Sequence, residues 1–190
     1  EPKWDGFRCL AFRDGRRVDL RSKAGKPLGR YFPDIVAAIA SVKAPRFVLD
    51  SEIVIAVNRA LSFDDLLQRI HPAASRVNKL AAQYTAELIV FDLLVDAKGK
   101  DLTSEPLAAR RAALDDFATH FLDGHPSIHL SPATTEVKKA NRWLAAKAGG
   151  LDGVMAKRAD APYASGERVA MMKVKRMRSA DCVVGGFRWG

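Results

Sequence analysis

The sequence predicts a mixed α+β domain. Short β-branched runs and stretches of helical periodicity follow one another without a regular strand–helix–strand rhythm. Hydrophobic residues make up 48% of the chain and charged residues 28%, which is typical of a globular domain. No apolar run approaches the roughly 18 residues needed to span a bilayer, so we expect no membrane partner. A GxxxxGK[ST] loop is absent from the sequence, which argues against a P-loop ATPase.

The first half of the chain is expected to begin with a hairpin. Residues 7–12 and 17–21 have strand character and are joined by the turn Asp14-Gly15. The hairpin is followed by a helix over 31–42, which tolerates Pro33 near its start. The remaining elements expected in this half are a buried strand over 47–57, a helix over 62–70 capped by Ser62, and a strand over 87–95.

The second half mixes the two element types again. A helix is expected over 105–122, with Pro106 in its first turn, and a short strand over 127–133. Thr134 or Thr135 starts a helix that ends at Gly149-Gly150. The last predicted elements are strands over 151–157 and 169–175 around a polar loop, and a strand within 181–188.

The charge balance favours a polyanionic partner. The chain has 31 Lys and Arg against 22 Asp and Glu, a formal net charge of +9. Neutralising phosphates would release condensed counterions, although a generally basic surface explains the charge about as well. Cys9 and Cys182 are far apart and have no CxxC spacing, so neither a zinc site nor a disulfide framework is indicated. We expect a reduced, cytoplasmic protein.

The most informative segment is EPKWDGFR at residues 1–8, which contains the pattern K-x-D-G-x-R. Average residue frequencies would produce this pattern by chance in roughly two of every thousand chains of this length. Lys3 would be a surface residue by default, because an amine becomes a covalent nucleophile only when burial or nearby cations lower its pKa. Further motifs are therefore needed to support a catalytic role.

Four further motifs follow in order. Asp50-Ser51-Glu52 and Phe91-Asp92 place carboxylates inside apolar strands, where they are costly unless they serve a ligand, a metal or an ion pair. The segment 152–157 reads DGVMAK, and 172–175 reads MKVK, which puts two lysines on one face of a strand. Two neighbouring ammonium groups repel unless an anion such as phosphate lies between them. Each motif alone has an ordinary structural explanation, but five in a fixed order do not.

Together these motifs resemble the covalent nucleotidyltransferase superfamily, and most closely the ATP-dependent DNA ligases of bacterial end joining. EPKWDGFR resembles motif I, SKAGKPLGRYFPDI motif Ia, VLDSEIVI motif III, IVFDLLV motif IIIa, DGVMAK motif IV and MMKVKR motif V. The resemblance implies a nucleotidyltransferase (ATP-grasp-like) fold of antiparallel sheets flanked by helices. It also implies an adenylation domain over 1–178, and at 179–190 a linker and the first strand of an OB-fold domain that is cut off.

The resemblance implies a role for each matching residue. Lys3 attacks the α-phosphate of ATP, and Lys173 and Lys175 neutralise that phosphate and lower the pKa of Lys3. Asp152 and Glu52 are the expected ligands of Mg²⁺ or Mn²⁺. The residues implied in ATP or AMP binding are Glu1, Pro2, Arg8, Glu52, Phe91, Lys157, Lys173 and Lys175. The residues expected to contact DNA are Lys23, Arg30 and Arg69.

The sequence departs from the family pattern at three positions. Asp152 stands where many relatives have glutamate, Ser51 where they have glycine, and Lys23 where they have arginine. A lysine cannot reproduce the bidentate arginine contact, so the DNA-end or ribose contact at Lys23 is in doubt.

The resemblance implies three chemical steps and a set of partners. The steps are adenylation of the enzyme, AMP transfer to a 5′-phosphate, and attack by a 3′-hydroxyl. Nicked or broken double-stranded DNA is the expected substrate, with fused or associated end-joining domains and a monomeric state at the bacterial nucleoid. Two alternatives remain open. A related RNA ligase or mRNA-capping guanylyltransferase would share these motifs, and a capping enzyme would use GTP. A non-catalytic DNA-binding module would form no covalent AMP adduct.

Overall fold

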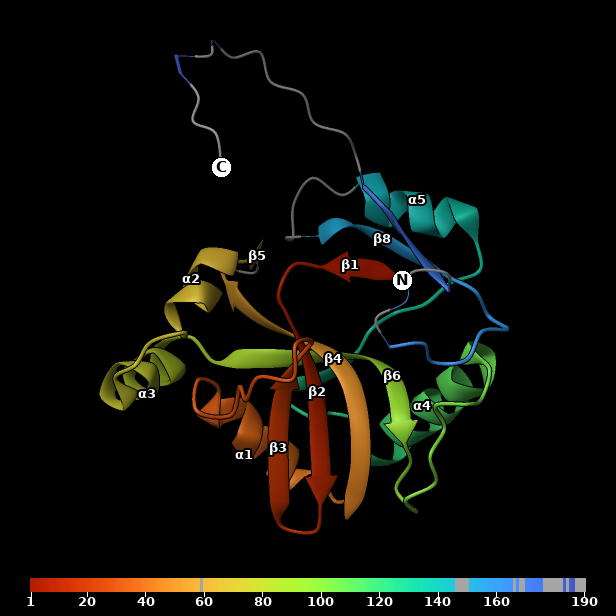
Figure 1. The fold of residues 1–190 in the computed structure, drawn as a ribbon, viewed down its shortest axis with the longest axis horizontal. Coiled ribbons are helices and arrows are strands. Elements are labelled where there is room, and N and C mark those ends of the chain that lie inside the picture. Colours follow the sequence, from red (N-terminus) through yellow and green to blue (C-terminus); the bar gives the residue numbers. More distant parts are fainter. Residues whose placement is uncertain are drawn as a thin grey trace.

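The polypeptide forms two sheets that face each other across the segment joining the first two strands (Figure 1). The computed structural model describes residues 1–58, 60–145, 151–165, 167, 170–175, 183, 185 and 186. Within these residues a six-stranded sheet has the order β3-β2-β4-β6-β7, with β5 paired to β4, and a three-stranded sheet has the order β1-β8-β9. The predicted α+β class is confirmed.

The large sheet is built around the predicted hairpin. Its strands are β2 (Phe7–Asp14), β3 (Arg17–Ser22), β4 (Arg46–Val57), β5 (Ala60–Leu61), β6 (Ala86–Val95) and β7 (Ile128–Leu130). Gly15 has φ +57°, a conformation that favours glycine in the tight turn between β2 and β3. The pairs within this sheet are antiparallel except β6 with β7, which is parallel. The large sheet is therefore antiparallel, as expected, except at this edge.

The small sheet brings the first strand of the chain together with its last two strands among the described residues. Its strands are β1 (Pro2–Trp4), β8 (Leu151–Lys157) and β9 (Met171–Val174), and both of its pairings are antiparallel. The indole Nε1 of Trp4 donates to the buried Ser131 Oγ at 2.9 Å, which ties β1 to the chain after β7. A strand of three residues is thereby held from both sides.

One face of the large sheet carries the hydrophobic core. Along β2 the side chains of Cys9 and Ala11 are fully buried. Arg8, the neighbour of Cys9 in sequence, lies on the opposite face of the sheet. Helices α1 (Pro33–Ser41) and α4 (Leu107–Phe121) pack against this sheet. Burial raises the pKa of the Cys9 thiol to about 12, so the thiol stays protonated and behaves as a small apolar group.

The remaining helices show where the sequence was harder to interpret. Helix α2 (Phe63–Gln68) begins after Ser62, whose hydroxyl accepts from the Asp65 amide as predicted. Helix α3 (Ala74–Gln83) was not predicted, because its segment carries few large apolar residues and Val77 is its one buried side chain. Helix α5 (Val137–Ala145) starts later than Thr134 or Thr135.

The start of α4 differs from expectation, and two predicted segments cannot be compared with the structure. Pro106 precedes α4 as its N-cap instead of lying in the first turn. The predicted helix end at Gly149-Gly150 lies outside the described residues, as does most of the predicted strand at 181–188. In the portions of the chain that the structure describes, no helix combines the length and apolar character needed to cross a membrane.

Candidate active site

The small sheet brings Lys3, Asp152 and Lys175 into direct contact. Lys3 lies opposite Gly153 in the β1–β8 register, which places its side chain beside the neighbouring Asp152. One carboxylate oxygen of Asp152, Oδ2, lies 2.5 Å from Lys3 Nζ and 2.5 Å from Lys175 Nζ. The side chain of Lys3 is 18% exposed, so the nucleophile predicted from the sequence is sheltered but reachable.

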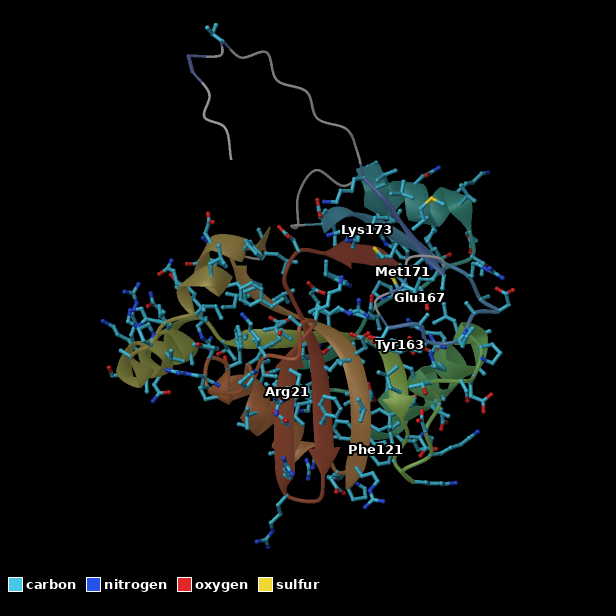
Figure 2. All side chains as sticks on the ribbon, viewed as in Figure 1. Arg21, Phe121, Tyr163, Glu167, Met171 and Lys173 are labelled. Carbon is cyan, nitrogen blue, oxygen red and sulfur yellow. The ribbon has the colours of Figure 1, made fainter. Side chains whose placement is uncertain are left out.

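The two lysines also determine the ionisation of Asp152. Burial alone would raise the pKa of Asp152, but hydrogen bonds from Lys175 and Lys3 outweigh it and hold the pKa below its ordinary value. Lys173 lies opposite Met155 in the β8–β9 register and is exposed, and no ion pair joins it to another described residue (Figure 2). The structure therefore brings Lys175 to the centre of the site and leaves Lys173 at its edge.

A second group surrounds the ring of Phe91 on β6. Lys157 Nζ lies 4.7 Å from the ring centroid and the Arg8 guanidinium carbon lies 5.8 Å from it. The Glu1 carboxylate pairs with Lys157 at 2.6 Å and lies 3.8 Å from Arg111. The sequence motifs at 1–8, 91–92 and 152–157 thus converge on one aromatic platform, as expected of a purine-binding pocket.

The structure adds two residues to this group that motif matching did not assign. Asp50 is fully buried on β4, and its carboxylate accepts from Arg8 Nε at 3.0 Å and from Arg8 Nη2 at 2.5 Å. The Tyr163 hydroxyl donates to Asp50 Oδ2 at 2.8 Å. A buried aspartate within an apolar strand did signal an ion pair, but Tyr163 lies in a polar loop and carried no sequence signal. Arg8 and Asp50 lie on neighbouring paired strands, and both side chains point to the sheet face opposite Cys9, so they can meet.

Glu52 is the second carboxylate beside Lys3. Burial raises the pKa of Glu52 to about 7, although the positive charges of Lys3 and Arg8 act in the opposite direction. No cluster of three or more His, Cys, Asp or Glu side chains suited to a metal ion occurs among the described residues. Asp152 and Glu52 flank Lys3, and two carboxylates fit Mg²⁺ when nucleotide phosphates complete its octahedron.

The raised pKa of Glu52 predicts a pH-dependent change in stability. A carboxyl group whose pKa rises on folding from 4.5 to about 7 stabilises the folded state below pH 4.5, and this contribution is lost as the pH rises through 7. The variant Glu52→Gln cannot ionise. Its melting temperature relative to wild type should therefore increase from pH 5 to pH 8, measured by thermal unfolding in EDTA without nucleotide. A difference that is constant with pH would contradict the burial of an ionised Glu52.

Two glycines allow the close approaches on which the site depends. A Cβ atom at Gly6 would lie 2.3 Å from the Ile53 carbonyl oxygen, and one at Gly153 would lie 2.2 Å from the Val174 carbonyl oxygen. Gly153 also has φ +142°, which L side chains rarely adopt. The glycines of motifs I and IV are therefore required by backbone packing around Lys3 and Lys175.

Gly153→Ala should reduce adenylation at least ~10-fold, because the new methyl group must push the Val174 carbonyl away and shift the adjacent Lys175. The rate of covalent labelling with ATP, together with the melting temperature, measures this effect. Gly15→Ala is a matched control, since Gly15 has φ +57° and a Cβ there would meet open space. The control should lose about 1 kcal/mol of stability and keep its labelling rate. Equal labelling rates in the two variants would show that the close approach at Gly153 is not needed.

The positions that depart from the family pattern are accommodated differently. Ser51 is fully buried, and its hydroxyl donates to the Cys9 carbonyl at 2.7 Å, so its polar atom has a partner. Lys23 lies in the exposed turn after β3, and Arg30 is exposed with Nη2 donating to the Pro72 carbonyl at 2.8 Å. Both remain available for the predicted contact with DNA.

The expected contact of Arg69 with DNA is wrong. The Arg69 side chain is fully buried and pairs with Asp34 at 2.7 Å. It also donates to the carbonyl oxygens of Tyr31 and Tyr84. A guanidinium enclosed in this way cannot reach a phosphate, and Arg69 is a structural residue.

Comparison with known proteins agrees with this arrangement. Residues 1–175 match the family model described as ATP dependent DNA ligase domain. The chain belongs to this family. The matched range includes the motifs named above except the last residue of motif V, Arg176, and the prediction of an ATP-dependent ligase nucleotidyltransferase domain is confirmed.

Curated relatives and solved structures give the same result. The chain is 50% identical over 190 residues to DNA ligase C of Mycobacterium tuberculosis, covering 99% of this chain and 52% of that protein. It is 49% identical over 189 residues to DNA ligase C2 of Mycolicibacterium smegmatis, with coverage of 99% and 52%. The ligase domain of LigD from M. tuberculosis has a TM-score of 0.69 at 26% identity, over 92% of this chain and 53% of that one. This member of the ligase family spans about half the length of the curated relatives it matches.

Proposed function

We propose that this ligase-family domain catalyses the adenylation step of DNA ligation, with Lys3 as the nucleophile. The observation that carries the proposal is the position of Lys3 Nζ, 2.5 Å from the Asp152 carboxylate that Lys175 also contacts. The Phe91 ring lies beside this group, flanked by Arg8 and Lys157. A sheltered amine, an aromatic platform and several cations suit attack on a nucleotide phosphate.

The proposed reaction exchanges one bond for another. The neutral amine of Lys3 attacks the α-phosphorus of ATP, an N–P bond forms, and the P–O bond to the β-phosphate breaks. Pyrophosphate leaves with the bonding electron pair, and the amine loses its proton. Lys175 and Lys173 would stabilise the charge that builds on the α-phosphate oxygens. Glu1, Pro2 and Phe91 would border the adenine, and Arg8 with Glu52 would hold the ribose.

A divalent cation fits the same site. Asp152 and Glu52 would hold Mg²⁺ or Mn²⁺ against the phosphates, where the ion would supply further charge neutralisation and orientation. Asp152 would exchange its contact with Lys3 for this role. The amine would then be released from its ion pair, which favours the unprotonated form that attacks.

We further propose that the AMP passes from Lys3 to the 5′-phosphate of nicked or broken double-stranded DNA, and that a 3′-hydroxyl then expels it. The net charge of +9 and the exposed Lys23 and Arg30 support a polyanionic partner. Since DNA is the proposed substrate, the protein would act in the cytoplasm at the nucleoid. We also propose that it acts as a monomer, with end-joining domains fused to it or associated with it. The proposed boundary is an adenylation domain over 1–178, with 179–190 opening an OB-fold domain.

The test is covalent labelling. The protein is incubated with α-³²P-labelled ATP and Mg²⁺, denatured and separated by electrophoresis, in parallel with labelled GTP. Label from ATP and none from GTP supports a ligase, whereas label from GTP favours a capping guanylyltransferase. A full-length protein that binds nicked DNA and takes up no label would overturn the catalytic proposal in favour of a DNA-binding module.

A further inference from the structure

The loop between β8 and β9 carries a tyrosine to the nucleotide side of the large sheet. Tyr163 lies at the junction of the two sheets, and Lys173 lies on the small sheet beyond it (Figure 2). The loop follows the strand that holds Asp152 and precedes the one that ends beside Lys175. It is thus the connection in sequence between the two elements that face Lys3.

The backbone of this loop is anchored independently of the Tyr163 hydroxyl. The amides of Leu107 and Ala108, in the first turn of α4, donate to the carbonyls of Ala161 and Ala159, both at 2.9 Å. The Tyr163 amide donates to the Thr103 carbonyl at 2.8 Å. Because three backbone bonds hold the loop against α4 and the segment before it, removing one side-chain hydroxyl should leave its position unchanged.

The ring and the hydroxyl of Tyr163 contact different groups. The Arg110 guanidinium carbon lies 5.7 Å from the ring centroid, and Arg110 pairs with the buried Asp92 at 2.9 Å. The hydroxyl donates to Asp50 Oδ2 at 2.8 Å and lies 3.4 Å from Arg8 Nη2. Burial raises the pKa of Tyr163, so the phenol stays protonated and remains a donor. Phenylalanine could therefore fill the packing role of the ring, but it could not replace the hydrogen bond that the hydroxyl donates to Asp50.

The hydroxyl closes a three-membered arrangement around Arg8. Asp50 binds Arg8 through Nε and Nη2, and both of its oxygens are used. Tyr163 shares Oδ2 with Arg8, and its hydroxyl lies near the guanidinium from the β8–β9 loop. A guanidinium held by one carboxylate can tilt about that carboxylate. A third contact restricts the tilt and keeps the plane of Arg8 in place beside Phe91, while 29% of the Arg8 side chain stays accessible.

We propose that Tyr163 is a positioning residue of the nucleotide site, whose hydroxyl orients Arg8 through Asp50 for contact with the ribose of ATP. This inference rests on the proposed function, because it assigns a residue to the same adenylation site. It connects the β8–β9 loop, which leads to the phosphate-facing lysines, with the ribose-facing arginine of the other sheet.

The test is Tyr163→Phe, assayed for adenylation with ATP and with 2′-deoxy-ATP. The variant should raise KM for ATP by ~5- to 10-fold, the range expected for one hydrogen bond to a charged group, and change kcat less. KM for 2′-deoxy-ATP should change less than KM for ATP. Its melting temperature should stay near that of wild type, because the ring still packs on Arg110. Tyr84→Phe is a matched control, since no hydrogen bond from its hydroxyl is found among the described residues.

A double-mutant cycle separates positioning from packing. If Tyr163 acts through Arg8, Tyr163→Phe should have no further effect on KM in an Arg8→Lys background. If the two substitutions raise KM by factors that multiply, or if Tyr163→Phe alone leaves KM unchanged, the inference is overturned. Labelling of the wild type would still support the proposed function. Absence of label from the full-length wild type would instead remove the proposed function itself.

Discussion

Lys3→Ala should lose all covalent AMP labelling from ATP. The amine at Lys3 Nζ is the atom proposed to form the N–P bond, and no other lysine shares its position opposite Gly153 among the described strand pairs. Lys175 meets the same Asp152 oxygen, but its side chain is 50% exposed, against 18% for Lys3. Because the reaction is covalent, loss of the nucleophile removes the intermediate itself, so we expect a reduction of at least ~1,000-fold. Denaturing electrophoresis after incubation with labelled ATP measures it.

Two further variants serve as controls for this experiment. Lys3→Arg keeps a positive charge beside Asp152 but offers no amine that can be deprotonated, so it should be equally unlabelled. Lys79→Ala removes an exposed lysine from α3 and should label like wild type. The variants should also melt near the wild-type temperature. Label of wild-type intensity on Lys3→Ala would mean that another residue is the nucleophile.

Arg69→Ala should destabilise the fold by about 3–5 kcal/mol, because it leaves the Asp34 carboxylate without its buried partner. Asp34 Oδ2 also accepts from the Ala86 amide at the start of β6, so this group joins α1, α2 and β6. The guanidinium additionally lies 5.1 Å from the ring centroid of Phe32. Denaturant unfolding followed by circular dichroism measures the loss.

Arg30→Ala is the control for this experiment. Arg30 is exposed, donates to one carbonyl oxygen and lies over the Tyr31 ring at 5.0 Å, so its removal should change the free energy of unfolding by less than about 0.5 kcal/mol. If Arg30 contacts a phosphate, its loss should instead weaken DNA binding and reduce the salt dependence of that binding. A stable Arg69→Ala protein with weakened DNA binding would restore the surface role first expected for Arg69.

The order of motifs was readable without coordinates because each motif is a short contiguous segment. The Ser62 cap predicted where α2 begins. The hairpin was predictable because its turn needs a residue that accepts positive φ, as Gly15 does. Local chemistry of this kind depends on neighbours in sequence.

Arg69 and α3 show why other features were not readable. A surface arginine and a buried one have the same letter, and the partner that buries Arg69 is 35 residues away. Helix α3 carries few large apolar residues and has one buried side chain, Val77, so hydrophobic content did not mark it. The parallel pairing of β7 with β6 was likewise set by a connection through α4 that no local pattern announces.

The sequence by itself predicted the ligase family, pointed to Lys3 as the proposed nucleophile and named most of the residues gathered around Phe91, because these are carried by residue types at set spacings within single strands. The tertiary structure alone decided that one oxygen of Asp152 would lie between Lys3 and Lys175, that Tyr163 would reach Arg8 through Asp50, and that Arg69 would be enclosed. Each of these contacts joins residues more than 20 positions apart. Their energies depend on burial and distance, which only the packed chain defines.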